Sequence, residues 1–381
     1  MAPDAIGVII TGMDAGQKIT HTWIVTALLL VSFHAIAQES ENLPDLLQPI
    51  VAPVEEGFRA PTAAPPAVAV SAVATAKPLA VVMAAMEPAL RKSVRDLAAL
   101  QIALDRHGFG IGLIDGETGF KTRQALLDFR YASGKGIGEP EARQQLLADP
   151  APLFVRYEIT SNDWAQVSDT PKDWEDASEL PAMNCRSLIE WLSEKFHVQP
   201  SFLRLLNSGI ADWGRTLVGC RICVPAVRSE EVKFDVKQIT IDTHCFRLRG
   251  YNAKGRMLCS FPCSIARDRT KVPAGELKVS NVAPHPNYTF DPTNFPESAR
   301  AQEIGHKLIL PPGPRNPVGV YWVSLSLPGY GIHGTPHPET IGNMESHGCF
   351  RLCNWDAHTL GQGMFLGLPV MLDSPPWILT K

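Results

Sequence analysis

The chain has 381 residues, of which 45% are hydrophobic and 19% are charged, and its formal net charge at pH 7 is −4. At about 150 residues per domain, this length is enough for two or three compact domains. The slightly acidic balance and the lack of a long basic tract argue against nucleic acid as a partner.

The first segment, residues 1–37, has the pattern of a secretory signal peptide. Lys18 precedes an apolar run of eleven residues from Trp23 to Phe33, and Ala35-Ile36-Ala37 offers small residues at the cleavage spacing. Such a run is long enough for the core of a signal peptide and too short to span a bilayer. We therefore expect export to the periplasm or cell envelope. Met13 is an alternative start, and an uncleaved anchor is the alternative to cleavage.

Residues 38–87 are predicted to be a linker rich in proline and alanine. Phe58 is the one aromatic residue in this segment, so little in it could nucleate a core. Low-complexity sequence of this kind forms an extended tether.

Residues 88–150 are predicted to form a small helical bundle domain. Leu97, Leu100 and Leu104 recur at helical spacing, and a turn at Asp115-Gly116 precedes a second helical run. The pattern resembles a peptidoglycan-binding domain of the three-helix type, carried by Gly108-Phe109, Asp115-Gly116, Gly119-x-Lys121-Thr122, Ala125-Leu126 and Phe129. Arg130 stands where that family often has glutamine. A structural spacer, in which the apolar stripe is simply core, is the alternative.

Residues 155–228 are predicted to form a small α+β module. Tyr157 to Thr160 would be a first strand, Ser187 a helix cap with Glu190 three residues later, and Gly219 to Pro225 a closing strand. The order resembles a LysM carbohydrate-binding module. An insertion from about Asp163 to Met183 is unusually long for so compact a unit.

The C-terminal segment is predicted to be β-rich. Ile239, Ile241 and Thr243 alternate, and a turn is expected at Asn252 to Gly255. Further strands are expected at Met257 to Ile265, Val320 to Leu325 and Pro369 to Leu372. Proline-rich stretches around Pro284 to Pro296 and Pro311 to Pro317 indicate long ordered loops, typical of a substrate cleft. Few helices are expected here, and we expect Cys349 near the start of a short helix or turn.

Two motifs near the C-terminus carry the chemistry. They are Gly331-Ile332-His333-Gly334-Thr335 and Ser346-His347-Gly348-Cys349-Phe350-Arg351. A thiol is a strong nucleophile as thiolate, and a nearby imidazole is the usual means of activating it. The glycines indicate tight backbone, as needed where amide groups approach a substrate carbonyl. The pairing of His333 with Cys349 therefore favours acyl transfer.

Residues 232–374 resemble the L,D-transpeptidase (YkuD-type) catalytic domain. The resemblance rests on the two motifs together with Pro312 to Gly319, Tyr321-Trp322, Ile341-Gly342 and Asn354-Trp355-Asp356-Ala357. It implies a β-sandwich-like fold. It also implies acylation of Cys349 by carbapenems.

The resemblance implies a role for each matching residue. Cys349 would be the nucleophile that attacks a peptidoglycan stem peptide, and His333 would be the general base, oriented by the carbonyl of Gly334. The other implied assignments are an oxyanion site at His347, Gly348 and the Cys349 amide, and substrate binding by Arg351, Ser346 and Thr335. His347 could instead be a hydrogen-bonded core histidine, and Arg351 could pair with a structural carboxylate.

Other uses of these thiols and imidazoles stay open in the sequence. The spacings of His333, His337, His347, Cys349 and Cys353 match none of the usual zinc patterns, so no metal is predicted. Cys353 departs from the family pattern, and so does Phe350, which replaces an aliphatic residue. If both thiols fell on one helix, Cys353 would face Cys349 and could form a resting disulfide, or it could be an inert apolar residue.

The chain has eight cysteines, and an exported protein commonly pairs them. Candidate pairs are Cys185 with Cys220 or Cys223, and Cys245 with Cys259 or Cys263, but connectivity cannot be read from sequence.

The sequence thus predicts a secreted multidomain cysteine transpeptidase that needs no metal or organic cofactor. Its partners would be peptidoglycan stem peptides and glycan strands, with a wall-anchored lipoprotein as one further acceptor. Water as acceptor would make it an L,D-carboxypeptidase. The alternative of another class is a wall-binding scaffold whose catalytic unit is silenced by a disulfide between Cys349 and Cys353.

Overall fold

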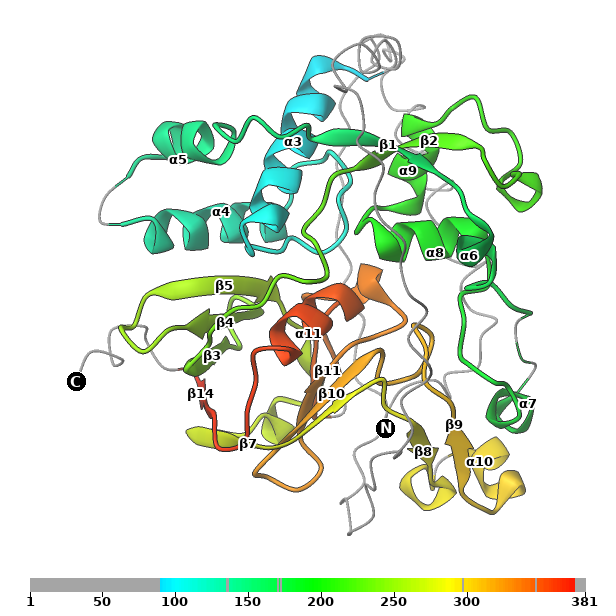
Figure 1. Cartoon of the computed structure of the whole chain (residues 1–381). Coiled ribbons are helices and arrows are strands. Elements are labelled where there is room, and N and C mark those ends of the chain that lie inside the picture. Colours follow the sequence, from blue (N-terminus) through cyan, green and yellow to red (C-terminus); the bar gives the residue numbers. More distant parts are fainter. Residues whose placement is uncertain are drawn as a thin grey trace, which may run out of the picture. The chain divides into compact units, whose positions relative to one another are not determined.

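The computed structural model describes residues 90–134, 137–169, 171, 173–296, 298–346 and 348–373 (Figure 1). All of them fall within one unit, Gln48–Lys381. The predicted signal peptide (1–37), the predicted linker (38–87) and His347 lie outside the described residues. Within the described ranges, no helix is both long and apolar enough to cross a bilayer.

The segment after residue 90 contains three helices, α3 (Lys92–Arg106), α4 (Phe120–Ala132) and α5 (Glu139–Leu146). The side chain of Gln101 on α3 holds the following turn, because its Oε1 accepts a hydrogen bond from Gly116 N at 2.8 Å and its Nε2 donates to Asp115 Oδ1 at 2.8 Å. Gly116 has a φ of +70°, a conformation that favours glycine. One buried polar side chain therefore fixes the path between α3 and α4.

The next segment forms a two-stranded antiparallel sheet of β1 (Phe154–Glu158) and β2 (Arg221–Pro225). Between them lie α6 (Ser161–Trp164), α7 (Trp174–Ser178), α8 (Leu188–Lys195), α9 (Pro200–Leu206) and η3 (Trp213–Arg215). The predicted cap at Ser187 is confirmed, because its side chain accepts a hydrogen bond from Glu190 N. The carboxylate of Glu190 in turn accepts a hydrogen bond from Arg186 N at 2.8 Å.

The C-terminal segment is built on one eight-stranded sheet in the order β13-β11-β10-β7-β14-β3-β4-β5. Its strands are β3 (Gln238–Asp242), β4 (Arg247–Tyr251), β5 (Met257–Pro262), β7 (Glu276–Pro284), β10 (Tyr321–Leu325), β11 (Gly331–His333), β13 (Phe350–Arg351) and β14 (Pro369–Leu372). Two short sheets pair β6 (Ile265–Ala266) with β12 (Met344–Ser346) and β8 (Tyr288–Phe290) with β9 (Leu308–Leu310). The helices are α10 (Ala299–Ile304), α11 (Asn354–Gly361), η4 (Arg269–Lys271), η5 (Pro292–Asn294) and η6 (Pro338–Thr340).

The prediction of a β-rich catalytic region is confirmed, but the strands form one continuous sheet instead of the two separate sheets of a simple sandwich. The reason is the length of β7, which pairs with β14 through Glu276 to Lys278 and with β10 through Val279 to Pro284. A single strand thus belongs to both halves of the sheet. Apolar side chains of both halves, with Leu360 of α11, share one buried cluster.

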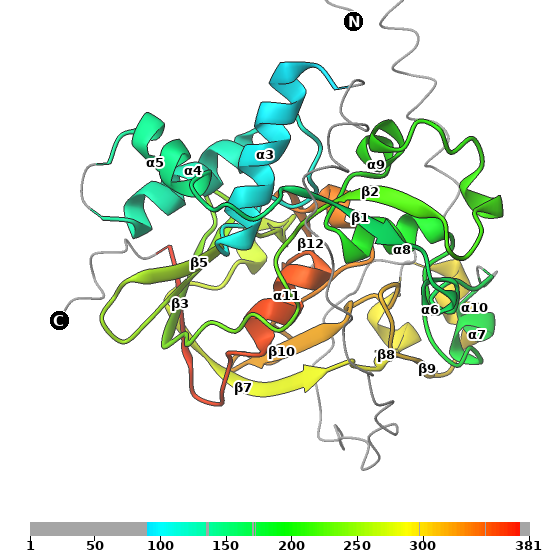
Figure 2. The same ribbon diagram turned by 45° about the horizontal axis from the view of Figure 1, so that its top comes forward.

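Helix α11 packs on β10 and β11, and both views show it beside β10 (Figures 1 and 2). The approach is close, because a Cβ atom added at Gly361 would lie 2.1 Å from the ring of Tyr321. A glycine at this position is therefore required for the packing of the helix on the sheet.

The helical segment also joins the sheet directly. The edge strand β5 exchanges backbone hydrogen bonds with the loop after α3, from Gly110 N to Ser260 O at 2.8 Å and from Ser260 N to Gly108 O at 2.9 Å. This pairing covers an edge that would otherwise present unpaired backbone groups. Below it, buried Asp128 on α4 accepts hydrogen bonds from Arg247 at 3.2 Å and Arg249 at 2.8 Å.

One hydrophobic cluster contains side chains from residues 90–150, from residues 154–228 and from β4 and β5. The insertion near α7 packs on β8, where Trp174 stacks on Phe290 with ring centroids 4.9 Å apart. The N-terminal segments are thus packed on the β-rich region within this unit. Whether they are peptidoglycan-binding and LysM-like modules stays a prediction.

Candidate active site

The sheet brings the predicted base and nucleophile onto neighbouring parallel strands. His333 is the last residue of β11, and Cys349 directly precedes β13. In the register of this pair, His333 lies opposite Arg351 and Ile332 lies opposite Phe350. Cys349 lies just outside this register, two residues before Arg351, and alternation along extended backbone would place its side chain on the same face as His333. The charge of Arg351 lowers the pKa of both His333 and Cys349, so the structure places Arg351 near both predicted residues.

Cys349 directly precedes strand β13 and follows a bend at Gly348, and the short helix α11 begins five residues later, so it lies near the short helix or turn that we expected. The helix α11 begins only at Asn354, and Cys353 is its N-cap residue. The two thiols therefore do not share a helix, which removes the geometry for facing side chains. Cys353 is fully buried in a small cluster with Ile341 and Trp355, and no disulfide joins the cysteines of the described ranges.

The imidazole of His333 is held in one tautomer by its neighbour. Its Nδ1 lies 2.6 Å from the carbonyl oxygen of Gly334, and a carbonyl only accepts, so Nδ1 carries the proton. Nε2 then has a lone pair, and this buried atom has no hydrogen-bond partner among the described residues. The ring is also stacked on Trp322, at a centroid distance of 5.3 Å. The result is a fixed, neutral imidazole with an available acceptor.

The geometry around Gly334 depends on a residue whose role the sequence did not reveal. A Cβ atom added at Gly334 would lie 2.1 Å from Oδ1 of Asn354, and one added at Gly319, where φ is +65°, would lie 2.0 Å from the same oxygen. Asn354 also accepts a hydrogen bond from Val320 N at 3.3 Å and donates one to Pro314 O at 3.0 Å. Its amide thus braces the backbone that orients His333. The sequence did show Asn354 next to Trp355 in the family motif, but the motif alone assigns no function to this asparagine.

Burial sets the protonation of the pair. Burial lowers the pKa of His333 to about 3, with a further decrease from the charge of Arg351 and a partial offset by the hydrogen bond to Gly334. Burial likewise raises the pKa of Cys349 to about 12, opposed by the Gly331 backbone amide and by Arg351. The resting pair is therefore a neutral thiol and a neutral imidazole near pH 7.

The Cys349 side chain lies beside the turn before β11 and two tyrosines. Its Sγ is 3.7 Å from the carbonyl oxygen of Gly329. Burial raises the pKa values of Tyr288 and Tyr330, and a charge on Cys349 raises both further. The strand β8 and the turn at Tyr330 therefore border Cys349.

The remaining predicted site residues have structural contacts of their own. Ser346 Oγ donates to Cys349 O at 2.5 Å and accepts from Gly348 N at 3.3 Å, so it braces the backbone next to the nucleophile. Thr335 is buried and accepts a hydrogen bond from His337 N at 3.2 Å. Arg351 is buried, and its backbone pairs with Ser264 through two hydrogen bonds.

One cluster in the described part of the chain has donors close enough for a metal ion: Asp242, His244 and Asp373. Asp242 already accepts a hydrogen bond from Arg249 at 3.0 Å, and Asp373 accepts one from Thr243 N at 2.8 Å. None of the three lines the His333–Cys349 face, and we assign no metal to them.

Comparison with known proteins agrees with this arrangement. Residues 237–367 match the family model of the L,D-transpeptidase catalytic domain, YkuD. A protein of Bacillus licheniformis, provisionally named L,D-transpeptidase YkuD, is 27% identical over 44% of this chain and 82% of its own length. A protein of Fuscovulum blasticum, provisionally named an L,D-transpeptidase in the ATP synthase subunits region, is 31% identical over 30% of this chain, which spans 58% of that relative. The predicted resemblance of the catalytic region is thereby confirmed.

Among solved structures, the L,D-transpeptidase from Mycobacterium smegmatis is 17% identical, with a TM-score of 0.29 over 42% of this chain and 65% of its own. An Enterococcus faecium L,D-transpeptidase is 18% identical, with a TM-score of 0.27 over 39% of this chain and 55% of its own.

Proposed function

We propose that the protein is a cysteine-dependent L,D-transpeptidase that forms a thioester between Cys349 and a peptidoglycan stem peptide and transfers it to an acceptor amine. One observation carries this proposal: Nδ1–H of His333 donates a hydrogen bond to the Gly334 carbonyl, which leaves Nε2 available to accept a proton, and His333 pairs with Arg351, two residues after Cys349. The family match of residues 237–367 supports an enzyme of this class.

In the proposed first half-reaction, Sγ of Cys349 attacks the carbonyl between an L-centre and a D-centre, and its proton passes to Nε2 of His333. The proton moves as the S–C bond forms, because neither group is charged in the resting site. The oxyanion would be held by Gly348, the Cys349 amide and His347, the last of which lies outside the described residues. The C–N bond then breaks, and the leaving amine takes the proton from His333.

The second half-reaction reverses these transfers with a new amine. The acceptor attacks the thioester carbonyl and gives its proton to His333, and the thiolate leaves and regains that proton. We propose that Arg351, Ser346 and Thr335 act at the substrate-binding side. Arg351 is a positive charge beside the pair, which suits a substrate carboxylate. An envelope or periplasmic location follows from the substrate and is part of the proposal.

Intact-mass measurement tests the proposal. The parent protein and Cys349→Ala are incubated with a stem tetrapeptide, first alone and then with a second stem peptide or a lipoprotein amine. An acyl adduct on the parent that is lost in the variant and discharged to the amine is the expected result. Discharge to water alone would identify an L,D-carboxypeptidase instead. No adduct on the parent, before or after mild reduction, would refute the enzyme and favour the wall-binding scaffold.

A further inference from the structure

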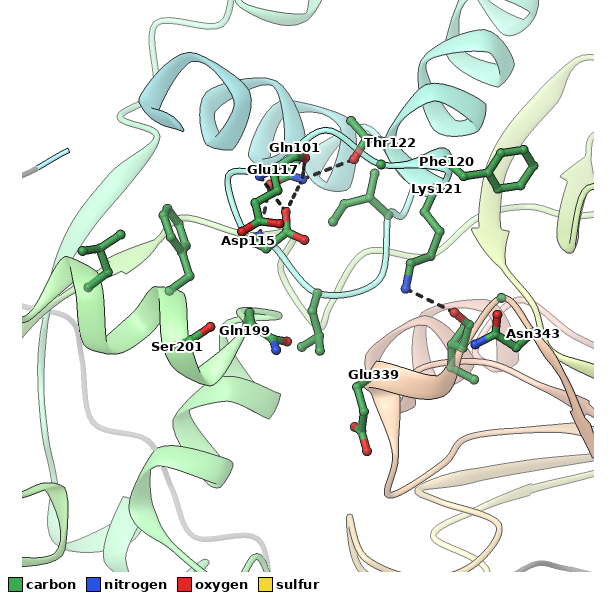
Figure 3. Close-up of a pocket in the computed structure, with 17 residues that line it drawn as sticks. Gln101, Asp115, Glu117, Phe120, Lys121, Thr122, Gln199, Ser201, Glu339 and Asn343 are labelled. Carbon is green, nitrogen blue, oxygen red and sulfur yellow. Dashed lines mark hydrogen bonds between the residues drawn. The ribbon is translucent and has the colours of Figure 1, made fainter. Parts of the chain in front are cut away.

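A cavity of about 750 Å³ lies where three parts of the described chain meet (Figure 3). Its lining includes Asp115 and Lys121 from the α3–α4 segment, Gln199 and Ser201 from the start of α9, and Glu339 from η6. This volume is within the range of small-molecule sites in proteins. The cavity thus belongs to no single segment, and it exists only because the N-terminal helices pack beside the catalytic loop.

The cavity is separate from the reacting pair, because neither His333 nor Cys349 lines it. One wall of the cavity nevertheless belongs to the loop that joins His333 to the segment before Cys349. Its η6 wall belongs to the loop between β11, which ends at His333, and β12, which precedes Cys349. Lys121 donates a hydrogen bond across the cavity to Ile341 O in that loop at 3.2 Å, as Figure 3 shows.

The charges of the lining restrict the ligand class. Asp115, Glu117 and Glu339 contribute three carboxylates against the single ammonium of Lys121, which disfavours anions such as phosphates or carboxylate-rich peptides. A cation would in turn meet the Lys121 ammonium, and Asp115 and Glu339 already interact with Gln101 and His337. A neutral ligand whose groups both donate and accept hydrogen bonds can donate to the carboxylates and accept from the Lys121 ammonium.

Uncharged polar groups complete the lining. The Gln199 amide and the Ser201 hydroxyl have no hydrogen-bond partner among the described residues, so both can bind a ligand. The Asn343 amide uses its Nδ2 on Thr340 O at 3.1 Å and keeps its oxygen available. Phe120 and Leu205, which also line the cavity and are 47% and 45% exposed, add apolar surface, on which the C–H face of a sugar ring could lie.

We propose that this cavity binds the glycan strand of peptidoglycan through its uncharged N-acetylated amino sugars. Ring hydroxyls would donate to the carboxylates and accept from Lys121, and the acetamido group would pair with Gln199 or Asn343. The identity of the polymer rests on the proposed transpeptidase function. The cavity would hold the strand beside the loop that connects the base to the nucleophile, while the stem peptide reaches the other side of that loop.

Calorimetric titration of the full chain tests this site, with an N-acetylglucosamine tetrasaccharide as one probe and a stem tetrapeptide as the other. All proteins carry Cys349→Ala, so that no turnover occurs. Ser201→Trp places a large ring at the wall of the cavity, and Arg204→Trp is the matched control, since Arg204 is exposed on the same helix and does not line the cavity. Gln199→Ala removes one ligand group. Equal thermal midpoints among the variants verify that the fold is kept.

The expected result is tetrasaccharide binding that weakens at least about tenfold in Ser201→Trp, weakens in Gln199→Ala and changes by less than about twofold in Arg204→Trp. No tetrasaccharide binding to the parent, or binding that Ser201→Trp leaves unchanged, would overturn the inference. Binding of the tetrapeptide that depends on Ser201 would replace the glycan with a peptide ligand. Acyl-adduct formation on the protein with Cys349 intact reports the transpeptidase separately, so either hypothesis can fail alone.

Discussion

Arg228 is the central cation of a buried network, and its removal gives the sharpest test of how the N-terminal helices support the catalytic region. Its backbone N donates to Asp105 Oδ2 at 2.8 Å, and its Nη1 donates to Asp105 O at 3.0 Å. Its Nη2 donates to Asp356 Oδ1 on α11 at 2.8 Å. The side chains of Arg228, Asp105 and Asp356 are 1%, 2% and 0% exposed.

Arg228→Met keeps most of the side-chain length and removes the charge. Breaking a buried ion pair from one side costs about 3–5 kcal/mol, because the remaining carboxylates stay buried without compensation. The expected result is a decrease of that size in the free energy of unfolding, measured by urea denaturation of the full chain. Asp105 keeps a contact with His197 Nδ1 at 3.1 Å, so Asp356 carries most of the loss.

The matched control is Arg221→Met, which breaks the exposed pair with Glu158 on β1, where the side chains are 66% and 55% exposed. Exposed pairs contribute about 0–1 kcal/mol, so this variant should unfold almost as the parent does. Equal effects of the two substitutions would refute the reasoning, since they would show that the buried network contributes no more than a surface pair.

The network also predicts a pH dependence for Arg228→Met. Burial raises the pKa of Asp356, and Arg228 opposes that increase. Without Arg228 the folded-state pKa rises further above the unfolded value, so the folded variant binds a proton that the unfolded chain releases. Its stability is then present at low pH and is lost as the pH rises through the folded pKa. The destabilisation should therefore be larger at pH 8 than at pH 5, and the opposite order would contradict this account.

Three further predictions concern the site itself. Gly334→Ala should slow acylation of the protein by a tetrapeptide donor, because the new Cβ would displace Asn354, whereas Gly209→Ala, with nothing within 4 Å, should not. Asn354→Ala should lower the free energy of unfolding by about 1–3 kcal/mol through loss of buried hydrogen bonds. It should also slow the same acylation while the circular dichroism spectrum of the folded protein stays unchanged. Alkylation of Cys349 by iodoacetamide, followed by peptide mass, should keep rising with pH beyond 9, since burial raises its pKa to about 12; a plateau near pH 7 would reveal a preformed thiolate.

The sequence predicts His333 and Cys349 as the reacting pair because each lies in a short motif whose residue types favour acyl transfer, and their roles stay a prediction. Other strands of the sheet were also predictable, since β3, β5, β10 and β14 follow alternating or apolar runs, whereas the short strands β11 and β13 beside the pair were not predicted. Their closure into one sheet was not, because it depends on β7 pairing with two different strands along its length. The sequence of residues 276–284 has no feature that distinguishes the part of β7 that pairs with β14 from the part that pairs with β10.

The supporting residues could not be predicted because their partners are distant in the chain. Asp105 and Asp128 lie on helices, where an acidic residue in sequence usually indicates a solvated face. In the fold both are buried, against Arg228 and Arg247 respectively. Helical periodicity identified the apolar stripe of α3, but it gave no sign that polar positions beside that stripe face a second part of the chain.

These contacts meet at α11, so this helix connects the N-terminal helices to the backbone around His333. Its first residue, Asn354, touches Gly334, whose carbonyl fixes the tautomer of His333. Two residues later, Asp356 binds Arg228, which in turn binds Asp105 on α3. We therefore expect a shift of α3 to reach the imidazole through these buried contacts. The N-terminal segments would then affect the proposed acyl transfer through the position of His333, and a tether to separate binding modules would not require this buried chain of charges.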